Sequence, residues 1–428
     1  MSRASRYVDS YYSKTCNRHL DFLPLRGDRS ADACVIGGGY MGLSSAIHLA
    51  DRGYSVVLLE AEKVAWGASG RNGGHCTLGQ RQPQETLEEN YGLDEARKLW
   101  DLSVEAVATV RQLIQRFGID CDLKRGNLQV AAKRSDADWY RRHGEHMKHR
   151  YGLDCRFVDR DELEYLSGSK AFKGGLLEYA SAHLHPLNFA LGLADAARGL
   201  GVQICENSRV IAYDRATPTT VKTIDGSVSA PYVVLACNGY LDRLEPRIAG
   251  HIMPINNFII TTEPLDPNRQ KQLNPEDLCM YDAKFVVNYW KLSADGRMLF
   301  GGGENYTRRF PHDIKSFVRK YLLQLYPQLA DVRIDHGWGG TLAVTMNRMP
   351  VFGRLDPAVF YALGFSGHGV QMATLGGKLV AEAVAGTAER FDVMARIPTP
   401  AFPGGTLLRW PGLVAGMLYH AIKDRLGD

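Results

Sequence analysis

Apolar and polar positions alternate in a clear order near the N-terminus, in ADACVIGGGYMGLSSAIHLADRGYSVVLLEAEK at residues 31–63. The apolar run at 32–36 predicts a buried strand, and residues 42–51 carry apolar side chains at helical spacing. Residues 55–60 predict a second strand. A strand, a helix and a strand in this order form a βαβ unit.

Three glycines occupy the turn between the first strand and the helix, as Gly37-x-Gly39-x-x-Gly42. Gly37 allows the tight turn, Gly39 lets the backbone approach a pyrophosphate, and Gly42 lets the helix pack closely on the strand. Glu60 ends the second strand, where its carboxylate can accept hydrogen bonds from a ribose. These features predict a dinucleotide at the helix N-terminus, and they leave open whether it is FAD or NAD.

The next segment, GASGRNGG at 67–74, is a loop of small residues around one cation, Arg71. Ser69, Asn72 and Gly73 belong to it, and such a loop has many backbone N–H groups free to point inward. The loop predicts a second approach of the chain to an extended cofactor. An ordinary surface loop is the alternative.

The middle of the chain contains amphipathic segments and two apolar runs. Helices are predicted at residues 94–117, 136–151 and 187–200. Strands of a βαβ type are predicted at residues 202–210 and 230–240, the second reaching Gly239. A glycine at that point would let the strand deliver its backbone to a cofactor.

From residue 251 to residue 303 the pattern changes to alternating strands with a hairpin turn at Asp295 and Gly296, which predicts a second, antiparallel domain. A helix at 313–326 and a turn at 337–340 are predicted after it. The segment from residue 358 then predicts an apolar strand, a glycine loop at 364–369 and a helix through Ala385. A second helix N-terminus is thereby aimed at a negative group.

Composition excludes several classes of protein. The 428 residues correspond to two or three domains at about 150 residues each. The 51 Lys and Arg against 47 Asp and Glu are scattered, so no nucleic-acid partner is expected. Eight cysteines without a CxxC pair, and an N-terminus without an apolar core, indicate a reduced cytoplasmic protein that is not a disulfide reductase.

The C-terminal stretch LLRWPGLVAGMLYHAI at 407–422 is apolar, but it is shorter than the ~20 residues that span a bilayer. Insertion of Leu413, Met417 and Leu418 into a membrane surface would make the protein membrane-associated, with a quinone as electron acceptor. Packing in the core or at a dimer interface is the alternative. In that case oxygen would be an equally suitable acceptor.

Several motifs together resemble the D-amino-acid-oxidase-type FAD oxidoreductases over nearly the whole chain. They are CVIGGGYMGLSSAIHLA, GASGRNGG, HPLNFALG, GFSGHGV and the C-terminal FPGGTLLRWP, and within this family they are most similar to those of gamma-glutamylputrescine oxidoreductases. The resemblance implies the cofactor FAD and an α/β fold, with a Rossmann-type, GR2-like FAD-binding domain and an inserted antiparallel-sheet α+β substrate domain. We expect an N-terminal extension at 1–23, FAD-binding segments at 24–92, 152–246 and 336–428, and substrate-binding segments at 93–151 and 247–335.

The resemblance also implies cofactor contacts at matching positions. The pyrophosphate would lie on Gly37, Gly39 and Gly42, and the ribose on Glu60. The remaining implied contacts are Ser69, Arg71, Asn72 and Gly73 for phosphate and flavin, the Val210 backbone for adenine, and Gly367, His368, Gly369 and Val370 for the flavin pyrimidine edge, where negative charge develops on reduction. Some relatives attach FAD covalently through a histidine near the position of His75, so we weigh covalent attachment there against a noncovalent flavin.

The substrate side departs from one branch of the family. In the sarcosine-oxidase branch a lysine binds the substrate carboxylate where this chain has Gln371, which favours a longer amine, although Arg71 or another cation could substitute. Candidate substrate contacts, each with ordinary packing as the alternative, are Tyr281, Tyr289, Trp290, Tyr306, His336 and Trp338. Glu304 would face a distal cation of a diamine, with an exposed hairpin carboxylate as the alternative.

The implied reaction is the oxidation of a C–N bond in a small, gamma-glutamylputrescine-like amine. A hydride passes to flavin N5, and the resulting imine is hydrolysed to an aldehyde, so no side chain is required as a strong base and no catalytic residue is named. The alternatives are oxidation of a secondary or cyclic amino acid such as L-pipecolate or sarcosine, a 2-hydroxy-acid or glycerol-phosphate dehydrogenase, and a nonenzymatic flavin-binding module. His143, His146 and His149 lie in a cationic segment, which predicts a solvated helix face rather than a metal site.

Overall fold

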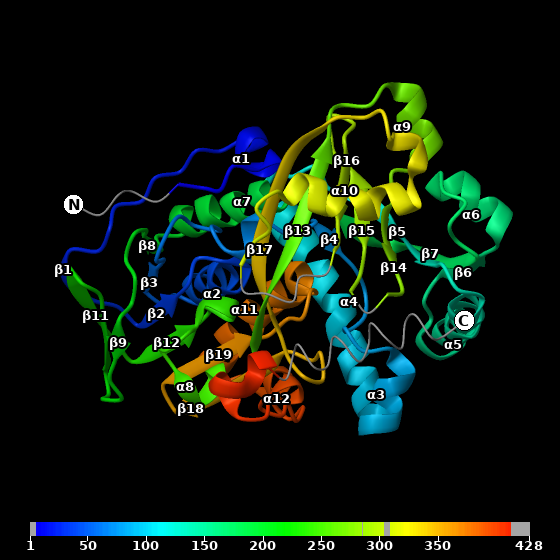
Figure 1. Ribbon diagram of the computed structural model, residues 1–428. Coiled ribbons are helices and arrows are strands. Elements are labelled where there is room, and N and C mark those ends of the chain that lie inside the picture. The colour runs from blue at the N-terminus through cyan, green and yellow to red at the C-terminus, as the bar shows by residue number, and fades with distance from the viewer. Residues whose placement is uncertain (1–5, 285, 304–308, 412–428) are drawn as a thin grey trace.

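The computed structural model describes residues 6–284, 286–303 and 309–411. Three sheets follow one another along the molecule, with a four-stranded sheet at one end, a six-stranded sheet beside it and a nine-stranded sheet toward the other end (Figure 1). The six-stranded sheet has the order β18-β19-β12-β2-β3-β8. Its strands are β2 (Ala33–Ile36), β3 (Val56–Leu59), β8 (Gln203–Cys205), β12 (Tyr232–Leu235), β18 (Val351–Asp356) and β19 (Val359–Leu363).

The predicted βαβ unit is confirmed as β2, α2 (Tyr40–Ala50) and β3, and its strands pair in parallel. All eight residues of β2 and β3 are buried, as expected for parallel strands that are covered on both faces. Alternate side chains divide between two cores. Ala33 and Val35 belong to a core shared with the helices, whereas Cys34 and Ile36 pack toward the four-stranded sheet.

Helix α2 packs between α7 (Pro186–Gly199) and α11 (Gly369–Val384). The contact with α11 is made by backbone, because a Cβ at Gly377 would lie 2.5 Å from Met41 O and 2.6 Å from Ser45 N. Ser44 Oγ donates a hydrogen bond of 2.6 Å to Thr374 O across the same contact. The predicted strand, glycine loop and helix at the C-terminal end are thus confirmed as β19, its following loop and α11.

The predicted strand at 202–210 is wrong in length, since β8 ends at Cys205. The following residues leave the sheet, and their backbone bonds to the end of β3, with Ser208 N donating to Glu60 O at 2.8 Å. The four-stranded sheet covers this side of the fold. It consists of β1 (Gly27–Ser30), β9 (Ala212–Tyr213), β10 (Thr219–Lys222) and β11 (Gly226–Ala230).

The nine-stranded sheet has the order β17-β13-β16-β15-β14-β5-β7-β4, with β6 paired to β7. Its strands are β4 (His75–Cys76), β5 (Lys124–Ala131), β6 (Cys155–Val158), β7 (Gly174–His183), β13 (Met253–Thr262), β14 (Cys279–Asp282), β15 (Tyr289–Leu292), β16 (Met298–Gly301) and β17 (Ile334–Val344). The hairpin around Asp295 is confirmed, because β15 and β16 pair antiparallel. The sheet is nevertheless mixed, since β14 pairs in parallel with β5.

The predicted turn at 337–340 is wrong, because these residues lie inside β17 and pair with β13. Two of the glycines serve close packing rather than chain reversal. A Cβ at Gly339 would lie 2.6 Å from the Phe310 ring, and one at Gly340 would lie 3.2 Å from Arg71 Cβ. The strand thereby approaches the loop that carries Arg71.

The remaining helices lie around these sheets (Figure 1). They are α1 (Tyr11–Thr15), α3 (Gln84–Tyr91), α4 (Leu93–Arg116), α5 (Arg134–Tyr151), α6 (Arg160–Ser167), α8 (Pro246–Ala249), α9 (Pro267–Leu273), α10 (Ile314–Leu325) and α12 (Glu389–Ala395). Helix α4, which the sequence analysis assigns to the substrate segments, packs on α3 and α11. The domain boundaries therefore stay a prediction.

The structure describes little of the C-terminal apolar stretch. Leu407 and Leu408 are exposed, whereas Leu413, Met417 and Leu418 lie outside the described residues. Within the described ranges, none of the helices combines the length and the apolar character that crossing a membrane requires.

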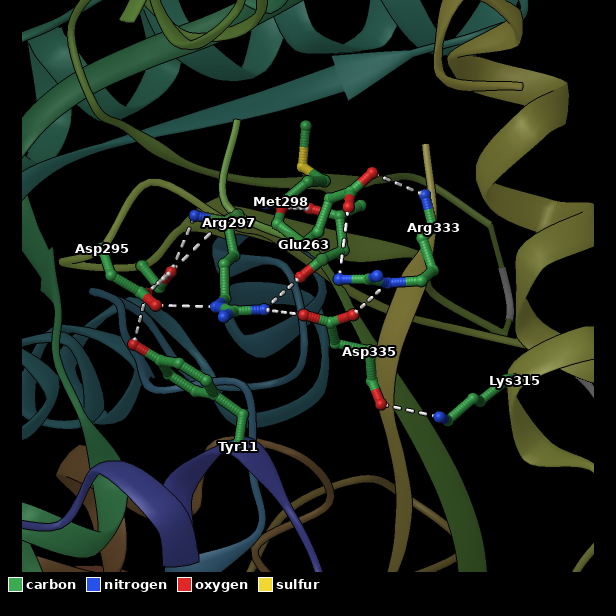
Figure 2. A network of polar contacts seen from close by, with 10 residues as sticks. Tyr11, Glu263, Asp295, Arg297, Met298, Lys315, Arg333 and Asp335 are labelled. Atoms are coloured by element: carbon green, nitrogen blue, oxygen red, sulfur yellow. Dashed lines mark hydrogen bonds and ion pairs between the residues drawn. The ribbon is translucent and has the colours of Figure 1, made fainter. Parts of the chain in front are cut away.

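A polar network around Arg297 joins the N-terminal helix to the large sheet (Figure 2). Arg297 Nε donates to Asp295 Oδ2 at 2.6 Å, and its Nη1 donates to Asp335 Oδ2 at 2.6 Å and to Thr262 O at 2.8 Å. The Tyr11 hydroxyl of α1 donates to Asp295 Oδ1 at 2.8 Å. One guanidinium therefore connects α1, the β15–β16 hairpin, β13 and β17.

Replacing this guanidinium should destabilise the fold in a pH-dependent way. Although burial raises the pKa values of Asp295 and Asp335, hydrogen bonds from Arg297 and other donors bring both below the ordinary value of 3.8. Their contribution to stability is thus present above that value and is lost as the pH falls through the lower values of the folded state. We expect Arg297→Gln to lower the free energy of unfolding by about 1–3 kcal/mol at pH 7, and by less at pH 3.

Urea unfolding at the two pH values measures this difference. Arg198→Gln is the matched control, because Arg198 pairs with Asp195 on the surface with 57% and 39% of the side chains exposed. An equal loss of stability for Arg297→Gln at pH 7 and pH 3 would contradict the assignment of the effect to the two carboxylates.

Candidate active site

A cavity of about 650 Å³ lies where the N-termini of α2 and α11 meet the loop at 67–74. This volume is within the range of small-molecule sites. The structure brings together there twelve of the residues that the sequence analysis selects: Gly39, Ser69, Arg71, Asn72, Gly73, His75, Tyr281, Tyr289, Gly367, His368, Gly369 and Val370.

The glycine turn before α2 has no room for side chains. Gly37 has φ +114°, and a Cβ there would lie 2.7 Å from Ala236 O. A Cβ at Gly42 would lie 1.9 Å from Gly37 O, and one at Gly39 would lie 2.9 Å from Ser69 Oγ. The turn is therefore held tightly between β12, α2 and the following loop, as the fingerprint requires.

Glu60, directly after β3, holds the glycine turn from the other side. Its Oε2 accepts a hydrogen bond of 2.7 Å from Gly38 N, and its Oε1 accepts one of 2.9 Å from Glu62 N. Burial raises the pKa of this carboxyl, whereas the two N–H donors lower it. The segment that contains Val210 runs beside Glu60, because Ser208 N bonds to Glu60 O. The predicted ribose and adenine contacts thus lie at one end of the sheet.

The loop at 67–74 is held in one conformation by its own polar side chains. Ser69 Oγ accepts a hydrogen bond of 3.0 Å from Tyr40 N at the start of α2. Asn72 Nδ2 donates to Ala68 O and Ser69 O, and its Oδ1 accepts a bond of 2.7 Å from Gly74 N. The Ser and Asn content that marks this loop in the sequence thus rigidifies it against the helix N-terminus.

Arg71 is buried at the cavity wall with only 7% of its surface exposed. Its Nε donates to Trp66 O at 2.6 Å, its Nη1 donates to Gly339 O at 3.3 Å, and the guanidinium stacks over the Trp66 ring at 4.0 Å. Among the described residues, its Nη2 has no hydrogen-bond partner. A buried donor without a partner costs free energy, which an anionic group in the cavity would recover.

The N-terminus of helix α11 is the second helix end at the cavity. Helix α11 follows His368, and no side chain caps its first N–H groups within the described residues. Burial lowers the pKa of His368 to about 3, with a further contribution from Arg81, so this imidazole is neutral at pH 7. Gly239 lies near the same loop, since the neighbouring Asn238 Oδ1 accepts a bond of 3.0 Å from Gly364 N.

These features fit FAD. Two helix N-termini favour its negatively charged parts, the glycine turn allows close approach of its pyrophosphate, and Arg71 offers an unused donor. Glu60 is placed for the ribose hydroxyls. The residues that would hold the cofactor are therefore the glycine turn, Glu60, the loop at 67–74 and the start of α11.

His75 borders the cavity behind this loop. Its Nδ1 lies 3.3 Å from Gly73 O and its Nε2 lies 3.2 Å from Met280 O, and the ring meets the edge of Tyr289. Burial, with a contribution from Lys291, lowers the pKa of His75 to about 4. Both ring nitrogens face backbone carbonyls, and this arrangement favours a noncovalent flavin.

The predicted substrate residues separate into four groups. Tyr281 and Tyr289 line the cavity. His336 faces Tyr11, and Trp338 is buried with its Nε1 donating to Arg71 O at 3.0 Å, so both pack behind the cavity wall. Glu304 and Tyr306 lie outside the described residues, whereas Trp290 is fully buried in the core of the large sheet.

Gln371 lies beneath the cavity rather than in its lining. It is fully buried on α11, and its Nε2 donates to Thr77 O at 2.8 Å. Its Oε1 has no hydrogen-bond partner among the described residues. Thr77 does line the cavity, so the side chain of Gln371 supports the wall from behind.

The prediction of a solvated histidine face is wrong for two of the three histidines. His143 Nδ1 lies 2.8 Å from Glu85 Oε1, and His146 Nε2 lies 2.8 Å from Glu88 Oε1, so α5 packs on α3 through these pairs. The partner carboxylates come from a segment about 58 residues away, which spacing within the helix does not reveal. His149 alone of the three is mostly exposed, and the described ranges contain no group of three metal-ligating side chains.

Several cavity residues are missing from the sequence prediction. They come from the loop after β4, from α5, from β7 and from the loop after β17, and they include Gln80, Arg81, Trp139, Tyr140, Glu178 and Arg348. They belong to no motif. The only sequence signal for Arg81 is its position shortly after the loop at 67–74.

Comparisons with known proteins agree with this geometry. Residues 32–383 match the FAD dependent oxidoreductase family, DAO, and the chain belongs to this family. It is therefore an FAD-dependent oxidoreductase, as the sequence analysis predicts.

Comparisons with single proteins show which sequences and folds this chain is similar to. The chain is 40% identical to the gamma-glutamylputrescine oxidoreductase of Escherichia coli (strain K12) over 99% of this chain and 100% of that protein. In fold it is similar to glycine oxidase from Geobacillus kaustophilus, with a TM-score of 0.69, 21% identity and coverage of 83% and 95% of the two chains. L-proline dehydrogenase from P. horikoshii has a TM-score of 0.70, 20% identity and coverage of 87% and 98%.

The position of Glu60 predicts a specific weakening of cofactor binding. We expect Glu60→Gln to raise the Kd for FAD by about 10-fold or more, because the amide replaces a charged acceptor that also positions Gly38. Fluorescence titration of the apoprotein with FAD measures the change. Glu62→Gln, whose side chain pairs with Arg209, is the control, and equal affinities for the two variants would contradict the role of Glu60.

The surroundings of His75 predict a flavin that is not covalently bound. Precipitation of the yellow holoprotein with acid should leave the flavin in the supernatant, because both nitrogens of this histidine already face carbonyl oxygens. The absorbance of the supernatant and of the redissolved pellet measures the division. A yellow pellet that loses its colour in His75→Ala would show covalent attachment and overturn this expectation.

Proposed function

We propose that this protein oxidises the primary amine of an N-acylated diamine of the gamma-glutamylputrescine type. The similarity to the E. coli enzyme of that name, over the full length of both chains, carries the proposal. Bound FAD would accept a hydride from the carbon that bears the amine, and the imine would then be hydrolysed to an aldehyde.

The surroundings of the cavity favour an uncharged amine as the reacting form. Two histidines of the wall, His75 and His368, are neutral at pH 7, and burial raises the pKa values of Tyr281 and Tyr289. Arg71 and the N-terminus of α11 make the potential positive at the cofactor side. An ammonium group is therefore disfavoured there, which removes the need for a strong side-chain base.

FAD would occupy the part of the cavity at the glycine turn, the loop at 67–74 and the start of α11, which leaves the part toward α5 for the substrate. The cavity lining runs from the glycine turn to Trp139 and Met147 on α5, past Tyr281 and Glu178. A diamine extended by an acyl group can reach from the flavin side toward α5.

A secondary or cyclic amino acid is the second candidate, and one observation favours it. Arg81 and Arg348 both line the cavity, and an amino-acid carboxylate could bind to them. The candidates differ in the distance between the carboxylate and the oxidised carbon. They can therefore be separated with substrates of different length.

Anaerobic reduction of the flavin tests the proposed function. We expect gamma-glutamylputrescine to bleach the flavin absorption band at about 450 nm faster than putrescine, spermidine, L-pipecolate, sarcosine or glycerol 3-phosphate. Among these compounds, only gamma-glutamylputrescine is both long and a carrier of a carboxylate. Stopped-flow spectroscopy measures the rates. Bleaching by L-pipecolate or sarcosine alone would establish the second candidate, and the speed of recovery in air would distinguish oxygen from another electron acceptor.

A further inference from the structure

The loop after β4 places an arginine, Arg81, at the wall of the cavity. Arg81 lines the cavity, and within the described part of the chain no hydrogen bond or ion pair involves its side chain. The flanking residues anchor the loop, because Gln80 Nε2 donates to Leu99 O at 2.9 Å and Gln82 Nε2 donates to Asn347 O at 2.8 Å. The chain on both sides of Arg81 is therefore held, and no carboxylate of the described residues pairs with its guanidinium.

A second arginine approaches from the opposite loop. Arg348 also lines the cavity, and it follows Asn347, the residue that Gln82 binds. Burial and then the positive charge of Arg81 lower the pKa of Arg348 to about 10. Two guanidinium groups are thus brought near each other at a partly buried wall, where like charges repel and an anion between them would be stabilised.

Two of the carboxylates that line the cavity, Glu178 and Asp282, are engaged elsewhere. Glu178 Oε2 accepts hydrogen bonds of 2.8 Å from the N–H groups of Ala180 and Ser181. Asp282 accepts bonds from the Asn288 backbone and side chain, which hold the loop after β14. These carboxylates stabilise backbone turns, so neither is assigned as the counter-ion of Arg81.

We propose that Arg81 and Arg348 form a binding site for the carboxylate of the substrate, at the end opposite the reacting amine. This inference rests on the proposed function, because a gamma-glutamyl diamine carries such a carboxylate and a free diamine does not. Guanidinium groups bind carboxylates through charge-assisted, often bidentate hydrogen bonds. The pair would then make the enzyme select acylated diamines over putrescine.

Two substrates that differ only in the carboxylate measure how much this group contributes to binding. Gamma-glutamylputrescine is compared with N-(4-aminobutanoyl)putrescine, which has the same chain and ammonium group but lacks the carboxylate. In Arg81→Gln and Arg348→Gln holoenzymes, the ratio of kcat/KM for the two substrates should fall by about 10- to 100-fold, mainly through KM. Arg81→Lys should retain part of the preference, because the charge stays while the planar fork is lost.

Arg142→Gln is the control, since it removes the same charge from an exposed position on α5. Flavin content and melting temperature confirm that each variant is folded. Suppose that the wild-type enzyme oxidises gamma-glutamylputrescine and that the ratio of kcat/KM for the two substrates is unchanged in both cavity variants. This result would overturn the arginine site, while the proposed function would stand. Absence of wild-type turnover would instead overturn the proposed function.

A binding measurement tests the arginine site even if the wild-type enzyme does not oxidise gamma-glutamylputrescine. L-glutamate, which carries the same carboxylate but no oxidisable diamine, is titrated into the holoenzyme while the visible spectrum of the flavin is recorded. Binding to the wild type that weakens about 10-fold or more in Arg81→Gln supports the site. Equal binding to the wild type and the variant, or no binding to either, overturns it.

Discussion

The backbone contact between α2 and α11 is the constraint on which the active site depends. Gly377 allows this contact, because any side chain there would overlap the backbone of α2. The two helices begin at the same cavity, one after the glycine turn and one after His368. Their N-terminal N–H groups therefore converge, and both helix dipoles favour the anionic parts of one cofactor. A wider separation of the helices would leave two unrelated anion sites.

The cavity combines positive charge with neutral acid–base groups. Helix N-termini and the arginines Arg71, Arg81 and Arg348 place positive charge at its wall, while burial keeps His75 and His368 neutral at pH 7. Such an environment stabilises phosphates, a substrate carboxylate and the negative charge of a reduced flavin. It also disfavours a protonated amine. In the proposed function, the same electrostatic arrangement would serve binding of the cofactor, orientation of the substrate and selection of the reactive protonation state.

The sequence predicted correctly those elements that depend on neighbours along the chain. The βαβ unit, the Asp295 hairpin and the loop before α11 follow from hydrophobic period and turn residues within some 30 positions. It failed at residues 337–340, because the glycines there serve packing against Arg71 and Phe310 rather than a turn. It also placed His143 in solvent, since its partner Glu85 belongs to another helix.

The sequence by itself determined the family and the cofactor and predicted the segments that would hold FAD, because a glycine fingerprint and its flanking strands act through local backbone geometry. Only the tertiary structure decided which side chains share the cavity. Arg81 and Arg348 are separated by 267 positions in the chain, yet Gln82 and Asn347 join their loops by one hydrogen bond. Such meetings arise when sheets and helices pack, and no local pattern encodes them. For this reason the sequence predicted many of the residues that meet at the glycine turn and the loop at 67–74, whereas it did not predict Arg81 and Arg348 in the cavity wall.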